Sequence, residues 1–212
     1  IVVYSSDHGD YACEHGQMEK APGICADAIT RIPYIWRWPN RIASGKVAAE
    51  IAETVDLSQT FCALAGLPLM ETSDGRDLSH ILRGGSGDVH RVGVTEFPWS
   101  KSVRKGRFRY VYYTPEMFPE EYADGGFGEL YDLEADPWEM RNLYYEQEYA
   151  DVLADMKKEL MDWMVLSTRP ATVHPLRQED TPQRITRYHH SVNADSKVHP
   201  DRIRKIRGSN YV

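Results

Sequence analysis

Consecutive strand-like segments joined by short turns occupy the middle of the chain. These segments are residues 91–97, 102–105, 108–113 and 128–133. Consecutive strands with such short connections favour an antiparallel sheet. A helical pattern follows over residues 149–166, and its apolar face carries Leu153, Met156, Leu160 and Trp163. An amphipathic helix of this kind is expected to cover one side of the sheet.

The part of the chain before this sheet mixes short strand and helix patterns. Strands are expected at residues 1–4 and 32–39, and helices at 55–65 and just before Leu82. The first strand is a continuous apolar run, which predicts a buried parallel strand that leads into a loop. Gly66 is placed to end the longer helix, since glycine readily adopts the left-handed conformation found there.

Two changes in sequence character divide the chain. A glycine-rich stretch at residues 84–87 separates the mixed segment from the sheet. We therefore expect an α/β segment over 1–88 and an antiparallel sheet with its helix over 89–168. Residues 169–212 are rich in proline, histidine, arginine and aspartate and form a tail. The tail is expected to be either disordered or an extended arm.

Composition excludes several classes of protein. The 212 residues are 42% hydrophobic, as expected for a globular core, and the formal net charge is -7. That charge argues against a nucleic-acid-binding protein, which normally carries a basic face. No apolar run is long enough for a membrane span. Three cysteines form no CxxC pair, and they do not decide the compartment.

A carboxylate and an imidazole stand together at the end of the first predicted strand. They are Asp7 and His8, followed by Gly9. Ligands of open α/β sheets bind at the carboxyl ends of strands, so this position suits a functional site. A turn in which Asp7 caps a following helix is the alternative interpretation.

Further motifs follow this pair in a fixed order. They are Ser6-Asp7-His8-Gly9-Asp10, Glu14-His15-Gly16, Lys20, Arg31-Ile32-Pro33-Tyr34-Ile35, Val55-Asp56-Leu57, Leu130-Tyr131-Asp132-Leu133, Asp136-Pro137-Trp138-Glu139 and Asn142-Leu143. In order and spacing, this series resembles the C-terminal half of the formylglycine-dependent (type I) sulfatases of the alkaline phosphatase superfamily. The resemblance covers residues 1–165. It implies that residues 1–88 are the C-terminal segment of the catalytic α/β sandwich and that 89–168 are the C-terminal subdomain.

The resemblance also implies roles for particular residues. Asp7 corresponds to a carboxylate ligand of one divalent cation, and His8 to the neighbouring ligand or to a residue facing the sulfate. Lys20 corresponds to a catalytic lysine that binds a sulfate oxygen and stabilises charge in the transition state. The resemblance makes calcium the first expectation for the metal. Manganese is the second, because the imidazole nitrogen of His8 suits manganese better than calcium. His15 is either a substrate contact or a surface histidine.

The catalytic nucleophile of this family is absent from the sequence. Formylglycine is made from the first residue of a Cys/Ser-x-Pro/Ala-x-Arg motif, and none of Cys13, Cys25 and Cys62 begins one. The paired aspartates that complete the family's metal site are also missing. The chain opens on an apolar run without methionine. We therefore expect this chain to be a fragment of a longer protein. The nucleophile and the remaining metal ligands are expected on a missing N-terminal part, and the fragment alone is expected to have little activity.

For the intact protein, the resemblance implies hydrolysis of a sulfate ester of a small molecule or a sulfated carbohydrate. Two alternatives stay open: a phosphonate monoester hydrolase or phosphodiesterase of the same superfamily, and a non-catalytic structural or assembly module. In some relatives a C-terminal arm reaches a neighbouring subunit. His189 and His190 in the tail suit such a homo-oligomer contact, and a flexible surface is the competing interpretation.

Overall fold

The computed structural model describes residues 1–20, 24–70, 73–123 and 126–167. Residues from Ile1 to Val165 form one compact unit, and a second unit begins at Leu166. The predictions for the tail, including an oligomer contact through His189 and His190, lie outside the described residues and stay predictions. The division between residues 88 and 89 likewise stays a prediction.

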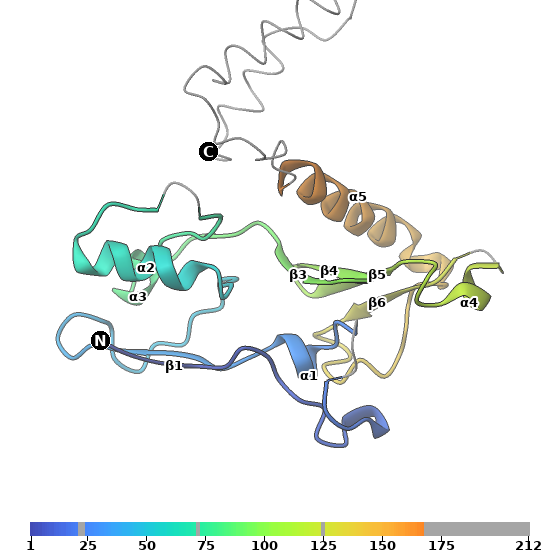
Figure 1. Cartoon of the computed structure of the whole chain (residues 1–212), viewed down its shortest axis with the longest axis horizontal. Helices are drawn as coiled ribbons and strands as arrows, with labels where there is room; N and C mark the ends of the chain where they lie inside the picture. The colour runs from blue at the N-terminus through green and yellow to red at the C-terminus, as the bar shows by residue number, and fades with distance from the viewer. Residues whose placement is uncertain (21–23, 71–72, 124–125, 168–212) are drawn as a thin grey trace, which may run out of the picture. The chain divides into compact units, whose positions relative to one another are not determined.

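A four-stranded antiparallel sheet forms the centre of the first unit, as the sequence predicts. Its strands are β3 (Gly93–Phe97), β4 (Ser100–Lys105), β5 (Phe108–Tyr113) and β6 (Gly128–Asp132), paired in the order β3-β4-β5-β6. Neighbouring strands are joined in sequence order, so the sheet is a simple meander. The long helix α5 (Ala150–Ser167) runs along one side of it (Figure 1).

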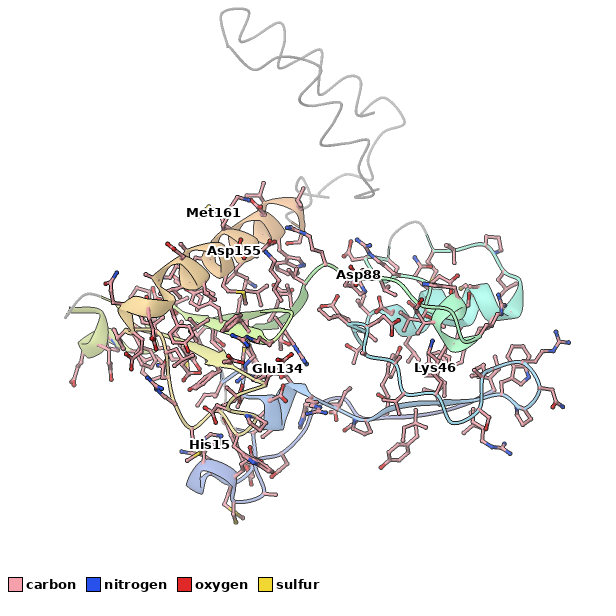
Figure 2. The ribbon with its side chains drawn as sticks, turned by 180° about the vertical axis from the view of Figure 1, so that it is seen from behind. His15, Lys46, Asp88, Glu134, Asp155 and Met161 are labelled. Carbon is pink, nitrogen blue, oxygen red and sulfur yellow. The ribbon has the colours of Figure 1, made fainter. Side chains whose placement is uncertain are left out.

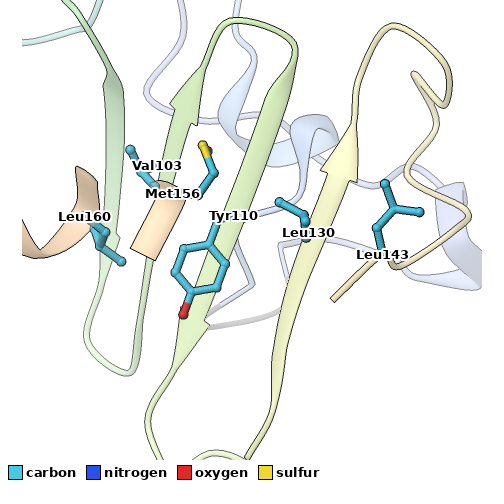
Figure 3. Close-up of a cluster of buried hydrophobic side chains, with 6 residues drawn as sticks. All are labelled: Val103, Tyr110, Leu130, Leu143, Met156 and Leu160. Carbon is cyan, nitrogen blue, oxygen red and sulfur yellow. The ribbon is translucent and has the colours of Figure 1, made fainter. Parts of the chain in front are cut away.

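The main hydrophobic core lies between this sheet and α5. Val103, Tyr110 and Leu130 are cross-strand neighbours in the register of β4, β5 and β6, so their side chains share one face. Met156 and Leu160 of α5 pack on this face with exposed fractions of 1% and 4%, and Leu143 completes the cluster (Figure 3). The predicted apolar face of the helix is therefore confirmed at its two most buried positions.

The opposite face of the sheet is covered as well. Val111 and Tyr113 of β5 are fully buried and pack with Cys25, just before helix α1 (Asp27–Thr30). Because both faces of β5 are covered, Arg109, Tyr110, Val111 and Tyr113 are buried, while Phe108 is half-buried and Tyr112 is exposed. The segment around Cys25 and α1 thus forms a second layer on this face of the sheet.

Two predicted helices form where the sequence places them. Helix α2 (Asp56–Ala65) ends at Gly66, which has a left-handed φ of 69°, and α3 (Ser79–Leu82) ends at Leu82 as predicted. Three short helices complete the described elements: η1 (Glu14–Gly16), α4 (Pro119–Ala123) and η2 (Gln147–Tyr149).

The environment of the first strand differs from the prediction. Strand β1 (Val2–Ser5) pairs antiparallel with β2 (Tyr34–Arg37) in a two-stranded ribbon, and Val2 and Tyr4 are 59% and 64% exposed. The prediction of a buried parallel strand is therefore wrong for this chain. An apolar run predicts burial only where other elements cover it, and in the described residues only β2 pairs with β1.

Candidate functional site

The loop after β1 is held against the start of the second layer by a close backbone approach at Gly9. Its N–H donates to the carbonyl oxygen of Ile29 at 2.8 Å. A Cβ atom at this position would lie 2.0 Å from the Ala28 carbonyl oxygen, well inside van der Waals contact. Only glycine fits here, and this contact fixes the direction in which Asp7 and His8 leave the strand.

We expect Gly9→Ala to destabilise the loop by about 2–4 kcal/mol, because the added methyl must displace backbone rather than a flexible side chain. Amide hydrogen exchange of residues 7–12 and 27–30 in the full-length protein measures this effect. Gly45→Ala is the control for a glycine whose Cβ atom would meet nothing within 4 Å; its φ of 68° disfavours alanine, but this strain lies outside the two segments that are measured. Equal protection in the two variants would show that the close approach has no structural role.

Asp7, His8 and Lys20 come together in this loop. The Lys20 Nζ lies 2.9 Å from His8 Nε2, and Asp7 Oδ2 lies 3.4 Å from the same nitrogen. The other ring nitrogen of His8, Nδ1, is 2.7 Å from the Gly9 carbonyl oxygen. A carbonyl oxygen only accepts, so Nδ1 carries a hydrogen, and in neutral His8 the Nε2 lone pair faces the Lys20 ammonium.

Local hydrogen bonds keep Asp7 ionised. The His8 backbone N–H donates to Asp7 Oδ1 at 2.9 Å, and this bond is the main reason that the pKa of Asp7 lies below its usual value. The side chain of Asp7 is 84% exposed and that of His8 is 36% exposed. The cluster therefore offers an accessible carboxylate oxygen, an imidazole nitrogen and an ammonium group.

These residues fit part of a metal site. A carboxylate is a preferred ligand of hard cations, and a histidine whose Nδ1 donates to a backbone carbonyl is oriented to ligate through Nε2. In the part of the chain that the structure describes, no group of three or more histidine, cysteine, aspartate or glutamate side chains is arranged to hold a metal. Asp7 and His8 would supply two ligands of a larger set, and Lys20 must turn away from His8 Nε2 for that nitrogen to ligate.

His15, which Figure 2 labels, lies in the short helix η1 and makes contacts other than those of this cluster. Its ring packs edge-on against Tyr11, with ring centroids 6.0 Å apart, and its Nε2 is 3.7 Å from Glu14 Oε1. It lines a cavity of about 170 Å³ whose lining does not include Asp7, His8 or Lys20. Of the four residues predicted for the site, the structure thus brings three together.

The loop that carries these residues is conformationally unusual. Four residues other than glycine have a left-handed backbone: Ala12, Cys13, His15 and Glu19. Such conformations cost free energy and persist where surrounding contacts impose them, often at functional sites. Two backbone hydrogen bonds close the loop, from Tyr11 N–H to the Glu19 carbonyl at 3.2 Å and from Cys13 N–H to the Gln17 carbonyl at 2.9 Å.

A buried ion pair beside this loop was not evident from the sequence pattern. Arg109 and Glu139 are only 2% and 5% exposed and contact each other. Arg109 also donates to the Cys25 carbonyl, and the Asp27 N–H donates to Glu139 Oε2 at 2.8 Å. The pair therefore joins β5 and the segment after β6 to the start of α1. An arginine between apolar residues in a predicted strand was the one available signal.

All three cysteines, Cys13, Cys25 and Cys62, are free thiols. Among the described residues, no helix combines the length and apolar character needed to span a bilayer.

Comparison with known proteins identifies close likenesses. Residues 13–165 match the family described as N-sulphoglucosamine sulphohydrolase, C-terminal. An N-acetylglucosamine-6-O-sulfatase of Bacteroides thetaiotaomicron is 30% identical over 175 residues, which cover 76% of this chain and 28% of that protein. A solved structure of a protein in complex with its substrate D-glucosamine-2-N,6-O-disulfate superimposes with a TM-score of 0.67 at 25% identity, over 81% of this chain and 36% of that one.

The phosphonate monoester hydrolase of Agrobacterium radiobacter also superimposes, with a TM-score of 0.64 at 22% identity, over 77% of this chain and 34% of that one. That likeness shows the shared fold alone. This chain spans between 28% and 36% of the lengths of these three proteins. The predicted fold class is confirmed, and the chain belongs to the sulfatase family described as N-sulphoglucosamine sulphohydrolase, C-terminal.

Proposed function

We propose that the full-length protein containing this chain hydrolyses sulfuric esters and that Asp7, His8 and Lys20 form one side of its active site. The observation that carries this proposal is the contact between Lys20 Nζ and His8 Nε2 at 2.9 Å, beside Asp7, in a chain of the sulfatase family. The three groups suit an anionic ester, because they combine ligand atoms for a cation with a positive charge for sulfate oxygens.

Each residue has a distinct proposed role. Lys20 binds a sulfate oxygen through its ammonium group and stabilises the charge that develops in the transition state. Asp7 and His8 hold a divalent cation, for which calcium is the first candidate and manganese the second. When bound, the cation supplies Lewis-acid polarisation of the sulfate group. The formylglycine nucleophile is expected on a part of the protein outside this sequence.

The relatives indicate a class of substrate. One acts on N-acetylglucosamine 6-O-sulfate by its name, and the solved neighbour holds D-glucosamine-2-N,6-O-disulfate. We therefore propose a sulfated sugar as the substrate of the full-length protein. In this proposal, residues 1–88 belong to the catalytic α/β domain and contain the ligands of the metal and the sulfate. Residues 89–168 form the C-terminal subdomain.

Hydrolysis of paired esters tests the reaction. The full-length protein is assayed with 4-nitrophenyl sulfate and with 4-nitrophenyl phenylphosphonate, which share the leaving group and differ in the transferred centre. We expect kcat/KM for the sulfate to exceed that for the phosphonate at least about tenfold. The reverse order would identify a phosphonate monoester hydrolase, and no hydrolysis of either ester would support a non-catalytic module.

A further inference from the structure

A small polar cavity lies between the loop that carries Lys20 and the sheet. Its volume is about 170 Å³. The loop side is formed by Tyr11, His15 and Gln17, and the sheet side by Arg109, Glu129, Tyr131 and Glu139. At about 30 Å³ for each water molecule, the cavity has room for five or six waters, or for the hydroxyl-bearing edge of one sugar ring.

The charges in the cavity wall largely cancel. Arg109 is the only cation of permanent charge in the lining, and it contacts the Glu139 carboxylate. A free anion therefore meets an arginine that is already neutralised, with Glu129 nearby. A free cation is not favoured either, because the Glu139 carboxylate already pairs with Arg109 and accepts a hydrogen bond from the Asp27 N–H at 2.8 Å. The wall is suited to a neutral polar group.

The wall nevertheless has unused hydrogen-bonding capacity. The Nε–H of Arg109 is buried and has no hydrogen-bond partner among the described residues. Arg109 itself is only 2% exposed, so this donor is open only toward the cavity that Arg109 lines. A buried donor without a partner costs free energy, and a hydroxyl oxygen entering the cavity is one group that satisfies it.

The two phenols of the lining, Tyr11 and Tyr131, are neutral donors and acceptors at physiological pH. Burial is the main cause that raises the pKa of Tyr11 to about 12 and that raises the pKa of Tyr131, so both hydroxyls keep their protons. Burial also raises the pKa of Glu129, although the Tyr113 hydroxyl donates to its carboxylate. Phenol, carboxyl and amide groups around one small space are the mixture that recognises sugar hydroxyls.

We propose that this cavity is a subsite for uncharged hydroxyl groups of the substrate's sugar ring. The inference rests on the proposed sulfatase function and adds residues that determine substrate preference. The link to the catalytic cluster is the loop itself, because Tyr11, His15 and Gln17 belong to the segment that ends at Lys20. The backbone bond from Tyr11 N–H to the Glu19 carbonyl joins the cavity wall to the residue before Lys20.

Substrates with and without a sugar test this subsite in the full-length protein. N-acetylglucosamine 6-sulfate carries ring hydroxyls, and 4-nitrocatechol sulfate has no sugar ring. We expect Tyr131→Phe and Gln17→Ala each to lower kcat/KM for the sugar sulfate about five- to tenfold, mainly through KM, and to leave the aryl sulfate within about twofold. Tyr112→Phe is the matched control, since Tyr112 lies outside the cavity lining and is 36% exposed.

The subsite would be overturned if the two variants lowered kcat/KM equally for both substrates, or if they left kcat/KM for the sugar sulfate unchanged. It would also be overturned if the wild-type protein hydrolysed the aryl sulfate alone. If the wild-type protein hydrolyses neither ester, the proposed function fails, and the subsite is then judged by binding. Ligand-observed NMR with unsulfated N-acetylglucosamine should show binding that Tyr131→Phe and Gln17→Ala weaken and Tyr112→Phe keeps. Absence of that binding would contradict the subsite independently of catalysis.

Discussion

Replacing Lys20 with alanine is expected to lower kcat/KM for sulfate-ester hydrolysis by the full-length protein about 10²- to 10³-fold. The Lys20 ammonium lies 2.9 Å from His8 Nε2 and is the one cationic side chain in contact with the Asp7–His8 pair among the described residues. Its removal takes away the positive charge proposed for the sulfate oxygens. It leaves the fold intact, because Lys20 is exposed and its side chain supports no core cluster.

Two further variants separate charge from geometry. Lys20→Arg keeps the charge with a different shape and should recover part of the loss, while Lys46→Ala removes an exposed lysine whose contact is the Gly85 carbonyl and should keep full activity. Steady-state kinetics with 4-nitrophenyl sulfate provide the measurement. A Lys20→Ala protein within about threefold of the wild type would exclude a role for Lys20 in transition-state stabilisation.

The largest expected effect on stability comes from Asp56→Ala, at about 3–5 kcal/mol. Asp56 is fully buried at the start of α2. Its carboxylate accepts from the Glu53 N–H at 2.8 Å, from the Arg76 N–H at 2.7 Å and from His90 Nε2 at 2.9 Å. Alanine leaves two partly buried N–H groups and the buried His90 imidazole without their acceptor.

Glycine at position 75 makes this network possible. A Cβ atom there would lie 2.0 Å from the Val55 carbonyl oxygen, so only glycine lets the 74–78 turn approach α2 closely enough for Arg76 to reach Asp56.

Amide hydrogen exchange of α2 in the full-length protein measures the loss of local stability caused by Asp56→Ala without assuming a two-state transition. Asp77→Ala is the control: its carboxylate serves only the Ser79 N–H and hydroxyl, so about 1 kcal/mol is expected. Similar protection in both variants would show that Asp56 is not the anchor of this region.

The fold was predictable where local pattern and tertiary packing agree. Strands β3, β4 and β5 are joined by short turns, and helix α5 has a continuous apolar face; both features act between residues close in sequence. Gly66 marked the end of α2 because its conformation depends only on the adjacent backbone. The environment of β1 was not predictable in this way, since its burial depends on which elements cover it.

The candidate site shows the same division. Asp7 and His8 are adjacent in sequence, and Lys20 follows in the same loop, so their proximity needs only local chain reversal. The contact between Arg109 and Glu139 instead joins a strand to a segment beyond the next strand. Because side chains alternate along β5, Arg109 and Tyr110 lie on opposite faces of the sheet. The sequence pattern does not reveal that the face carrying Arg109 is covered as well.

The metal content of the purified full-length protein tests the central claim most directly, because it depends on Asp7 and His8 without requiring a substrate. Elemental analysis after dialysis should find one divalent cation per chain, calcium or manganese. Its occupancy should fall at least about tenfold in Asp7→Ala and stay unchanged in Asp151→Ala, a variant at an exposed position in α5. An Asp7→Ala protein that binds the cation as the wild type does, or a wild-type protein that binds none, would contradict the proposed site.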